Sequence, residues 1–353
     1  MKIGLIGLAA SGKTTVFQAL TALDSGAALR RGKKSDNIAV VEVRDERVSR
    51  LSTMYNPART TYATIEIVDF AGAERNGANK SEIYRPPSAI TGNIDALAVV
   101  LGNFSGAQGE PDPVGDLKKI EAEMLLGDMV IAENRLERIR DGYKRGRNGN
   151  GTEREAALLR RIVSEMNDGR PIRALELDCE EKKIIRVFQF LTMKPLMAVL
   201  NSEETRFGKN SVMLKEIAGA CEAIEFAGRF EMELSHMQEE EARDFMNDMG
   251  IGKSACDRLA EIAYRTVNYI SFYTVGSDEV RAWPLRRGMT AVEAAGTIHS
   301  DLARGFIRAE CFSYDDLVEC GSEKKIRERG RFRLEGKNYI VRDRDILSIR
   351  SGL

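Results

Sequence analysis

The chain has 353 residues, 30% of them charged, and its 53 basic residues nearly balance its 54 acidic ones. The length predicts two or three domains. The nearly neutral net charge excludes a protein that attracts nucleic acid through an overall positive charge. Apolar runs such as 96–101 are too short for a bilayer, and five widely spaced cysteines with two histidines predict neither a zinc site nor a disulfide framework, so we expect a cytoplasmic protein without a membrane partner.

Short apolar runs with helical patterns between several of them predict an α/β protein. The expected strands of a largely buried sheet cover residues 3–6, 38–43, 65–68, 96–101 and 195–200. A ligand of such a sheet binds beyond the carboxyl ends of the strands.

The segment 7–14 follows the first of these runs and reads Gly-Leu-Ala-Ala-Ser-Gly-Lys-Thr, a complete phosphate-loop motif before a helical pattern. Main-chain N–H groups converging at a helix start favour a triphosphate. A chance match is the alternative, which the flanking strand and helix make less favourable. The expected nucleotide-binding residues of this segment are Gly7, Ala10, Ser11, Gly12, Lys13, Thr14 and Thr15.

The strand at 65–68 runs into Asp69, and a D-x-x-G pattern ends at Gly72. A phosphate-loop site needs an acid near the metal and a glycine N–H for the γ-phosphate. We therefore expect Thr14 and Asp69 to hold Mg²⁺ and Gly72 to contact the nucleotide.

Residues 112–184 change to dense charge with apolar positions at helical spacing. Two charged helices, joined by a glycine-rich turn at 147–151, predict an antiparallel hairpin inserted before a later strand. Its apolar seam is expected to include Leu117, Ile120, Met124, Ile131, Leu136 and Ile139.

The strand at 195–200 is followed by Asn201-Ser202-Glu203-Glu204, where guanine-specific proteins usually carry N-K-x-D. Serine replaces the lysine and Glu204 stands at the aspartate position. Two of the residues that bind guanine in those proteins, which together form a guanine clamp, are therefore altered, and adenine becomes plausible as the base of the bound nucleotide. We expect Asn201 and Glu204 to contact the nucleotide. A polar turn in which Asn201 caps a helix is the alternative.

From about residue 270, short strands predict a separate α+β module. Its expected strands are 270–275, 280–285, 306–312, 331–334, 339–341 and 346–349, with one helix at 291–298. Trp283 is expected to anchor this module rather than to contact a cofactor.

The three motifs in this order, with a charged hairpin before N-x-x-E, resemble the YchF branch of the Obg-type P-loop proteins. The segments 280–288, 294–301, 305–310, 313–317 and 333–341 closely resemble the TGS module of that family. The likeness covers nearly the whole chain and includes Asp-Pro-Val-Gly-Asp-Leu at 112–117.

The resemblance implies a P-loop NTPase of the Obg type, a coiled-coil insertion and a C-terminal β-grasp (TGS) domain. The expected ranges are 1–111 and 184–269 for the nucleotide-binding domain, 112–183 for the hairpin and 270–353 for the TGS-like domain. Family members hydrolyse ATP, often alongside GTP, and associate with ribosomes. A ribosome or ribosomal subunit is therefore the expected partner, structured RNA is a further candidate, and no DNA specificity is evident.

Several positions depart from the family pattern. No threonine stands in the switch segment before residue 37, most glycines expected after Gly72 are missing, and residues 102–112 lack the expected histidine. Neither His236 nor His299 can be transferred to that role. No general base is identified, although Glu74 is a weak candidate for positioning water.

The sequence therefore favours a slow Mg²⁺-dependent ATPase or GTPase that acts as a switch, with ATP preferred. A ribosome- or RNA-binding protein that holds nucleotide with little hydrolysis is the alternative. A scaffold in which nucleotide only stabilises the fold is a third hypothesis.

Overall fold

The computed structural model describes residues 1–22, 28–31, 37–69, 94–105, 109–144, 150–234, 237, 241–242, 244, 246 and 252–352. The chain forms two compact units, of which one comprises Lys2–Ala39 and Glu66–Ala255 and the other Met1, Val40–Ile65 and Cys256–Leu353. This division groups Val40–Ile65 with the C-terminal part, so it does not follow the four ranges expected from the sequence, which stay a prediction. No helix in the described part of the chain is both long and apolar enough to span a membrane.

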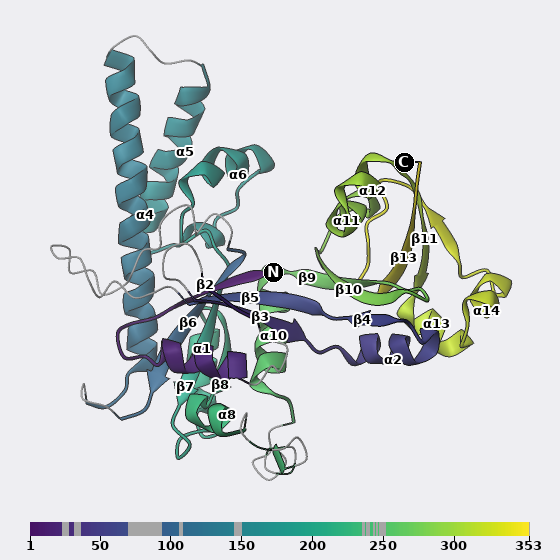
Figure 1. Ribbon diagram of the computed structural model, residues 1–353. Coiled ribbons are helices and arrows are strands. Elements are labelled where there is room, and N and C mark those ends of the chain that lie inside the picture. The colour runs from purple at the N-terminus through teal and green to yellow at the C-terminus, as the bar shows by residue number, and fades with distance from the viewer. Residues whose placement is uncertain are drawn as a thin grey trace. The chain divides into compact units, whose positions relative to one another are not determined.

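A seven-stranded sheet has the strand order β2-β3-β5-β1-β6-β7-β8 (Figure 1). Its strands in chain order are β1 (Lys2–Ile6), β2 (Ala28–Arg31), β3 (Asn37–Val43), β5 (Ala63–Asp69), β6 (Ala96–Asn103), β7 (Leu196–Ser202) and β8 (Glu222–Phe226). The five strands from β5 through β1, β6 and β7 to β8 are parallel. The five strands predicted from apolar runs are confirmed as β1, β3, β5, β6 and β7, whereas β2 and β8 were not predicted.

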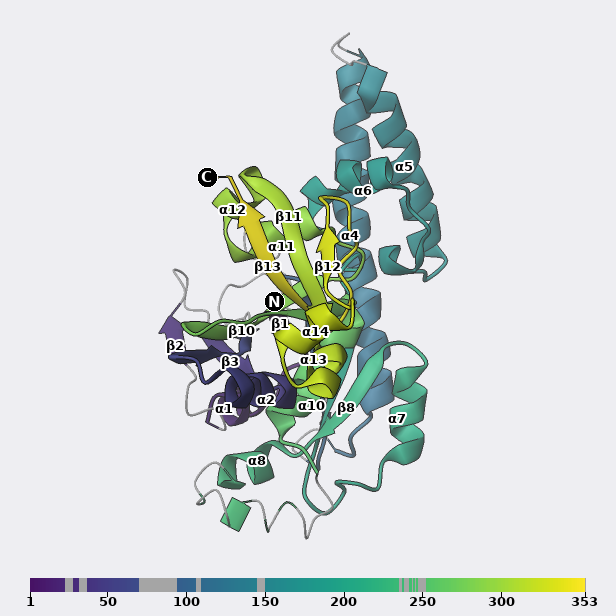
Figure 2. The same cartoon turned by 90° about the vertical axis from the view of Figure 1, so that its right-hand side faces the viewer.

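The helices beside this sheet bury its apolar faces. They are α1 (Lys13–Ala22), the long α4 (Pro113–Lys144), α7 (Ser211–Ala218) and α8 (Gly228–Leu234). One core cluster joins α4 and α7 to side chains of β6 and β7. Figure 2 shows α4 and α7 on one side of β8 and α8 on the other.

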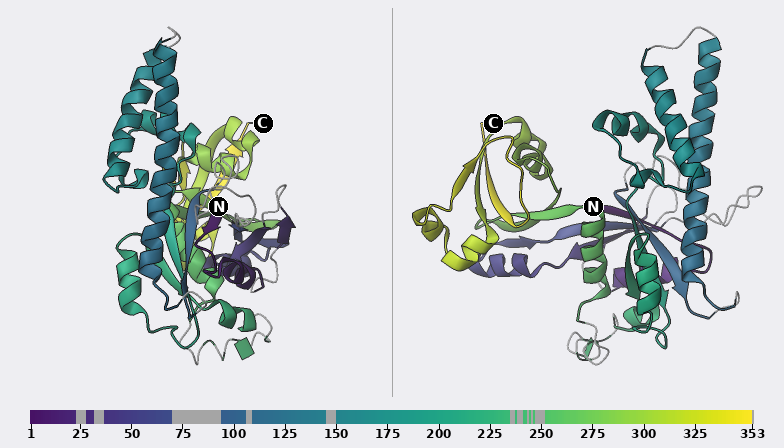
Figure 3. Two further views of the ribbon diagram at one scale, coloured as in Figure 1. Left: turned by 90° about the vertical axis from the view of Figure 1, so that its left-hand side faces the viewer. Right: turned by 180° about the vertical axis from the view of Figure 1, so that it is seen from behind.

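The predicted helical hairpin is present. Its second helix, α5 (Asn150–Asn167), lies beside the C-terminal part of α4 in both views of Figure 3. The pair shares an apolar cluster, and Arg135 of α4 donates two hydrogen bonds to Glu155 of α5 at 2.8 and 2.9 Å. Two 3₁₀ turns (Ile172–Ala174 and Arg186–Phe188) and α6 (Cys179–Ile185) lead back to β7.

The predicted seam of the hairpin is only partly right. Leu117, Ile120 and Met124 pack in the core cluster of the sheet, while Ile131, Leu136 and Ile139 pack in the cluster shared with α5. The reason is length, because α4 has 32 residues and α5 has 18. One continuous apolar stripe on a helix about 48 Å long therefore serves two different partners.

A second sheet has the order β12-β11-β13-β9-β10-β4. Its elements are α2 (Glu46–Tyr55), β4 (Arg59–Thr61), α10 (Ala255–Val267), β9 (Tyr269–Thr274), β10 (Glu279–Arg286), α11 (Ala291–Ile298), α12 (Ser300–Arg304), β11 (Phe306–Ser313), α13 (Tyr314–Cys320), α14 (Glu323–Glu328), β12 (Arg333–Glu335) and β13 (Asp345–Ser351). Central β9 and β13 are parallel, and antiparallel β10 and β11 flank them, as in a β-grasp fold.

Helices cover both faces of this second sheet. The alanines of α11 pack with Phe272, Leu285 and Leu347 on one face, and α2, α13 and α14 enclose Tyr273 and Phe312 on the other. The predicted strand 339–341 is wrong, because Ile340 forms only an isolated bridge to Thr290. The strand predicted at 331–334 is present as β12, but it covers Arg333–Glu335 and so begins slightly later than predicted.

Two features of this unit concern residues that the sequence singled out or missed. Trp283 is an anchor as expected, since its Nε1 donates to Thr274 Oγ1 at 3.0 Å and its ring stacks on Phe272. Strand β4 was not predicted. It pairs in parallel with β10, and Thr61 Oγ1 donates to Glu279 Oε1 at 2.6 Å. Three residues are too few to show strand periodicity.

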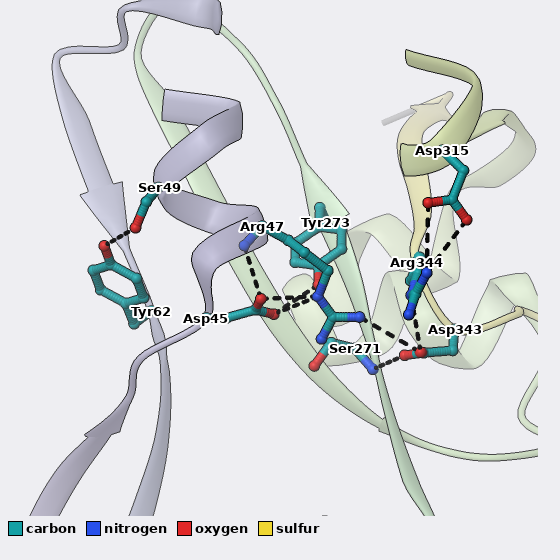
Figure 4. A network of polar contacts seen from close by, with 9 residues as sticks. All are labelled: Asp45, Arg47, Ser49, Tyr62, Ser271, Tyr273, Asp315, Asp343 and Arg344. Atoms are coloured by element: carbon teal, nitrogen blue, oxygen red, sulfur yellow. Dashed lines mark hydrogen bonds and ion pairs between the residues drawn. The ribbon is translucent and has the colours of Figure 1, made fainter. Parts of the chain in front are cut away.

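A polar network near the start of α2 ties that helix to β9 (Figure 4). Asp45 is the N-cap residue and accepts hydrogen bonds from Arg47 N, Arg47 Nε and Tyr273 OH at 2.9, 2.8 and 2.7 Å. The Arg47 guanidinium also lies 3.5 Å from Asp343, which accepts from Ser271 N at 3.0 Å. Every charge in the network faces an opposite charge or a hydrogen-bond donor.

Candidate nucleotide-binding site

The loop between β1 and α1 has a backbone that requires glycine. Gly12 has φ +85°, and a Cβ at this position would lie 2.2 Å from Asn201 Nδ2. A Cβ at Gly7 would lie 2.5 Å from the carbonyl oxygen of Val100. Both glycines therefore permit close approach of the loop to neighbouring strands. Ala10 also adopts a positive φ of 60°, which is uncommon for a residue with a Cβ.

Two polar side chains of this loop lie over its own backbone. The Lys13 ammonium donates to the carbonyls of Gly7 and Leu8 at 2.8 and 3.2 Å. Ser11 Oγ is buried and has no hydrogen-bond partner among the described residues. A buried hydroxyl without a partner is unfavourable, and a bound oxyanion would relieve this cost.

The predicted metal ligands are a threonine at the start of α1 and an aspartate at the end of β5. Thr14 lies in the first turn of α1 and is exposed, so its hydroxyl is accessible. Asp69 is the last residue of β5, is only 6% exposed, and stands opposite Leu5 in the parallel register of β1 and β5. A hydroxyl and a carboxylate beside a triphosphate suit Mg²⁺, which prefers oxygen ligands and retains several waters. The donor set therefore fits this ion.

Asn201 connects the loop to two other segments. It is the last residue but one of β7, its Nδ2 donates to the Ser11 carbonyl at 3.4 Å, and its Oδ1 accepts from Gly228 N at 3.2 Å. The structure thus brings Asn201 together with Ser11 and Gly12. Gly228 is the first residue of α8, so Asn201 also accepts a hydrogen bond at a helix start, although this is not the helix that follows β7 in the chain.

Glu204 lies on the exposed segment that follows β7. Its neighbour Glu203 pairs with Arg206 at 2.8 Å, and this hydrogen bond lowers the pKa of the Glu203 carboxyl below its usual range. Arg206 also donates to Ser105 and Glu110 at 3.0 and 3.1 Å. These contacts hold the Glu204 segment beside the segment that follows β6.

Three residues that the motifs did not indicate lie at the same edge of the sheet, and two of them, Gly228 and Phe104, adjoin the same loop. Gly228, at the start of α8, lies so close to Thr15 that a Cβ would be 3.0 Å from Thr15 Cγ2. The half-buried Phe104 ring lies 3.7 Å from the position of a Gly12 Cβ. Glu225, one residue before the end of β8, is considered below. The strand-like run 222–226 before Ala-Gly was the available signal for two of them; nothing local marks Phe104.

Several predicted positions lie outside the residues that the structure describes. They are Gly72, Glu74 and His236. His299 is described and lies between α11 and α12, where its Nδ1 accepts from Asp301 N at 3.2 Å. That role as a helix N-cap accounts for His299 without catalysis.

A parallel sheet with a glycine-dependent loop leading into α1, an acid at the end of a neighbouring strand and an asparagine bonded to the loop defines a P-loop NTPase fold. The second sheet adds a C-terminal domain. Residues 269–351 match the family model YchF-GTPase_C, described as "Protein of unknown function (DUF933)".

Curated relatives match nearly the whole length of the chain. It is 33% identical over 365 residues to the "Ribosome-binding ATPase YchF" of Bacillus subtilis, with 98% of each chain covered. It is 34% identical to the protein of the same name from Haemophilus ducreyi, with 99% of this chain and 98% of the relative covered. The structure of the Schizosaccharomyces pombe YchF GTPase superposes with a TM-score of 0.85 at 28% identity, covering 99% and 97% of the two chains. The chain belongs to the YchF family.

Proposed function

We propose that this chain binds a Mg²⁺–nucleoside triphosphate at the β1–α1 loop and hydrolyses it slowly, with ATP favoured over GTP, as a ribosome-associated switch. The observation that carries the proposal is the approach of Gly12 to Asn201, which leaves no room for a Cβ and joins the phosphate loop to the segment expected to read the base. The names of the relatives, a ribosome-binding ATPase and a GTPase, support it.

The phosphates occupy the loop of residues 7–15. Its main-chain N–H groups, including those of Ala10, Ser11 and Gly12, surround the β-phosphate, and Lys13 exchanges the Gly7 and Leu8 carbonyls for phosphate oxygens. Thr14 and Asp69 would hold Mg²⁺, which would neutralise charge on the β- and γ-phosphates. Gly72, beyond the described residues, is assigned to the γ-phosphate by its place in the motif.

The base lies next to Asn201 and Glu204. A glutamate at the latter position accepts a hydrogen bond from the amino group of adenine, while serine in place of lysine removes the long side chain that covers guanine in N-K-x-D proteins. These two differences favour ATP. Water attacks the γ-phosphate, and no residue of this chain is assigned as its base.

The ribosome is the proposed partner and the cytoplasm the proposed location. Both rest on the names of the relatives, which extend over nearly the full length of this chain. Structured RNA is the part of the ribosome that we propose this chain contacts.

A paired titration tests the proposal. Mg-ATP and Mg-GTP are titrated against the full chain, and phosphate release is followed in the same samples. We expect saturable binding of both with ATP tighter, and slow release that Lys13→Ala reduces at least about 100-fold because the ammonium stabilises charge that develops on the phosphates. Lys215→Ala, an exposed lysine of α7, is the matched control.

Each other outcome is informative. Binding without phosphate release would favour the nucleotide-holding, ribosome-binding alternative. Absence of binding to either nucleotide, or an unchanged Lys13→Ala variant, would contradict the proposal. Co-sedimentation with ribosomal particles across a salt series tests the partner, because contacts to RNA phosphates weaken as salt rises.

A further inference from the structure

Polar residues lie at or next to the ends of three adjacent parallel strands of the seven-stranded sheet. Asn103 ends β6 and Ser202 ends β7, and the two stand opposite each other in the register. Glu225 lies one residue before the end of β8. All three are buried, with exposed fractions of 1%, 4% and 9%. Burial of polar groups requires that they bond to one another or to the backbone.

Glu225 is the common acceptor of this cluster. Its Oε1 accepts from Ser202 Oγ at 2.7 Å and from Asn210 Nδ2 at 2.5 Å, and its Oε2 accepts from Gly208 N at 3.0 Å. Asn103 Nδ2 in turn donates to Ser202 Oγ at 3.0 Å. Hydrogen bonds to a buried carboxylate are stronger than those between neutral groups.

The cluster and the phosphate loop lie on opposite sides of β7. Successive side chains of a strand point to opposite faces, so Asn201 reaches Ser11 while Ser202 reaches Glu225. Ser202 takes the position of the lysine in N-K-x-D proteins, and its hydroxyl is therefore bonded to groups of the protein itself.

The bonds to Glu225 fix both ends of one segment. Ser202 precedes the segment 203–207, which contains Glu204, and Gly208 and Asn210 follow it. The segment is exposed at Glu204, so its own packing supplies little restraint there. One buried carboxylate therefore anchors both ends of the segment that bears Glu204, in addition to the contacts that Arg206 makes within it.

We propose that Glu225 is a positioning residue for nucleobase recognition, acting through the segment 203–207. This rests on the function proposed above and adds to it a determinant of base affinity and choice that lies outside the motifs. Glu225 does not touch the nucleotide. Its effect is confined to the base, because the phosphate loop is held separately by Asn201, Gly228 and its own helix.

Glu225→Gln is the informative change. The amide keeps the size of the side chain but turns one acceptor into a donor, which then opposes either the Gly208 N–H or the Asn210 amide. We expect the Kd for Mg-ATP to rise about 5- to 20-fold, the ratio of ATP to GTP affinity to fall, and the Kd for Mg-tripolyphosphate to stay within about twofold. Calorimetric titrations of the full chain measure all three.

Two further variants keep the test decisive. Ser202→Ala removes one donor and is expected to give a smaller change of the same kind, which covers the case in which Glu225→Gln unfolds. Glu222→Gln, an exposed glutamate of the same strand, is the matched control. The effects of Glu204→Gln and Glu225→Gln should be less than additive, because both act through one contact.

The inference and the proposed function fail differently. Equal losses for ATP and tripolyphosphate, or unchanged ATP affinity and base preference in a folded Glu225→Gln variant, would overturn the inference alone. A wild-type chain that binds neither probe would overturn both. A purely structural role predicts a lower melting temperature without a change in the ATP-to-GTP ratio.

Discussion

The β1–α1 loop with its neighbouring strand ends and the polar network at α2 use similar residues in different ways. In the loop, Ser11 Oγ has no hydrogen-bond partner among the described residues, and the Lys13 ammonium donates to the carbonyls of Gly7 and Leu8. At α2, Asp45 accepts hydrogen bonds from a main-chain N–H, a guanidinium and a hydroxyl. Arg47 contacts Asp45, Asp343 and the ring of Tyr273.

This difference separates groups arranged for a ligand from groups arranged for stability. Buried polar atoms cost free energy unless they are paired, so a site for a triphosphate carries a cost until the ligand binds. The α2 network carries no such cost. Substitutions in the loop should therefore affect nucleotide affinity most, and substitutions in the network should affect unfolding most.

The largest effect is expected from Gly12→Ala. The added Cβ would lie 2.2 Å from Asn201 Nδ2 at a backbone conformation of φ +85°, so the loop must move away from β7. We expect Mg-ATP affinity to fall at least about 100-fold, a loss of 2.8 kcal/mol or more, measured by calorimetry. Gly169→Ala is the control, since Gly169 also has a positive φ but nothing lies within 4 Å of its Cβ position. Equal effects of the two changes would mean that backbone strain alone is responsible.

A smaller effect of a different kind is expected from Asp45→Asn. The amide cannot accept from Arg47 and Tyr273 as the carboxylate does, and it leaves the partly buried Arg47 without its nearest charge. We expect a loss of about 2 to 4 kcal/mol in unfolding free energy, measured in urea, with Mg-ATP affinity unchanged. Asp315→Asn, at an exposed pair 3.4 Å from Arg344, should cost less than about 1 kcal/mol. A fall in ATP affinity would break the proposed separation.

The Asp45 contribution should depend on pH. Burial alone would raise the pKa of this carboxyl, but hydrogen bonds and charge from Arg47, with the hydroxyl of Tyr273, outweigh burial and lower the pKa below its usual value. A lowered folded-state pKa gives stability that is present above the unfolded pKa of about 3.9 and is lost as the pH falls through the folded value. The stability difference between wild type and Asp45→Asn should therefore shrink below about pH 4. A constant difference from pH 7 to pH 3 would contradict this.

The smallest effect is expected in the helical hairpin. Arg135 and Glu155 form a two-bond pair between α4 and α5, and 40% of the Arg135 side chain is exposed. Arg135→Ala should lower the unfolding free energy by about 0.5 to 1 kcal/mol, and the loss should be smaller in 1 M salt. Arg140→Ala, whose pair with Glu137 is 3.7 Å long and more exposed, is the control. A loss above 2 kcal/mol would show that the seam depends on this pair.

Local patterns predicted the elements that are long or strongly apolar. The runs at β6 and β7 are buried on both faces and needed no alternation to be recognised, and the phosphate loop followed from fixed spacing. Short elements were missed. Strand β4 has three residues and pairs with β10 more than 200 positions later, so its identity depends on a partner that the local sequence does not contain.

The candidate site shows the same division. Gly7, Lys13, Thr14, Asp69 and Asn201 belong to motifs with their own spacing, and the sequence alone assigned them to one nucleotide site. Glu225, Gly228 and Phe104 have no such spacing. They adjoin the site because β6, β7 and β8 are parallel neighbours whose carboxyl ends meet at one edge of the sheet.

The sequence by itself determined the class of fold, the phosphate loop and the hairpin, because these depend on residue type and short-range periodicity. Only the tertiary structure decided that α4 divides its apolar stripe between the sheet and α5, that β4 joins the second sheet, and that Glu225 holds the segment bearing Glu204. Each of these depends on which distant residues become neighbours, and hydrogen bonds and apolar contacts act only over a few ångströms.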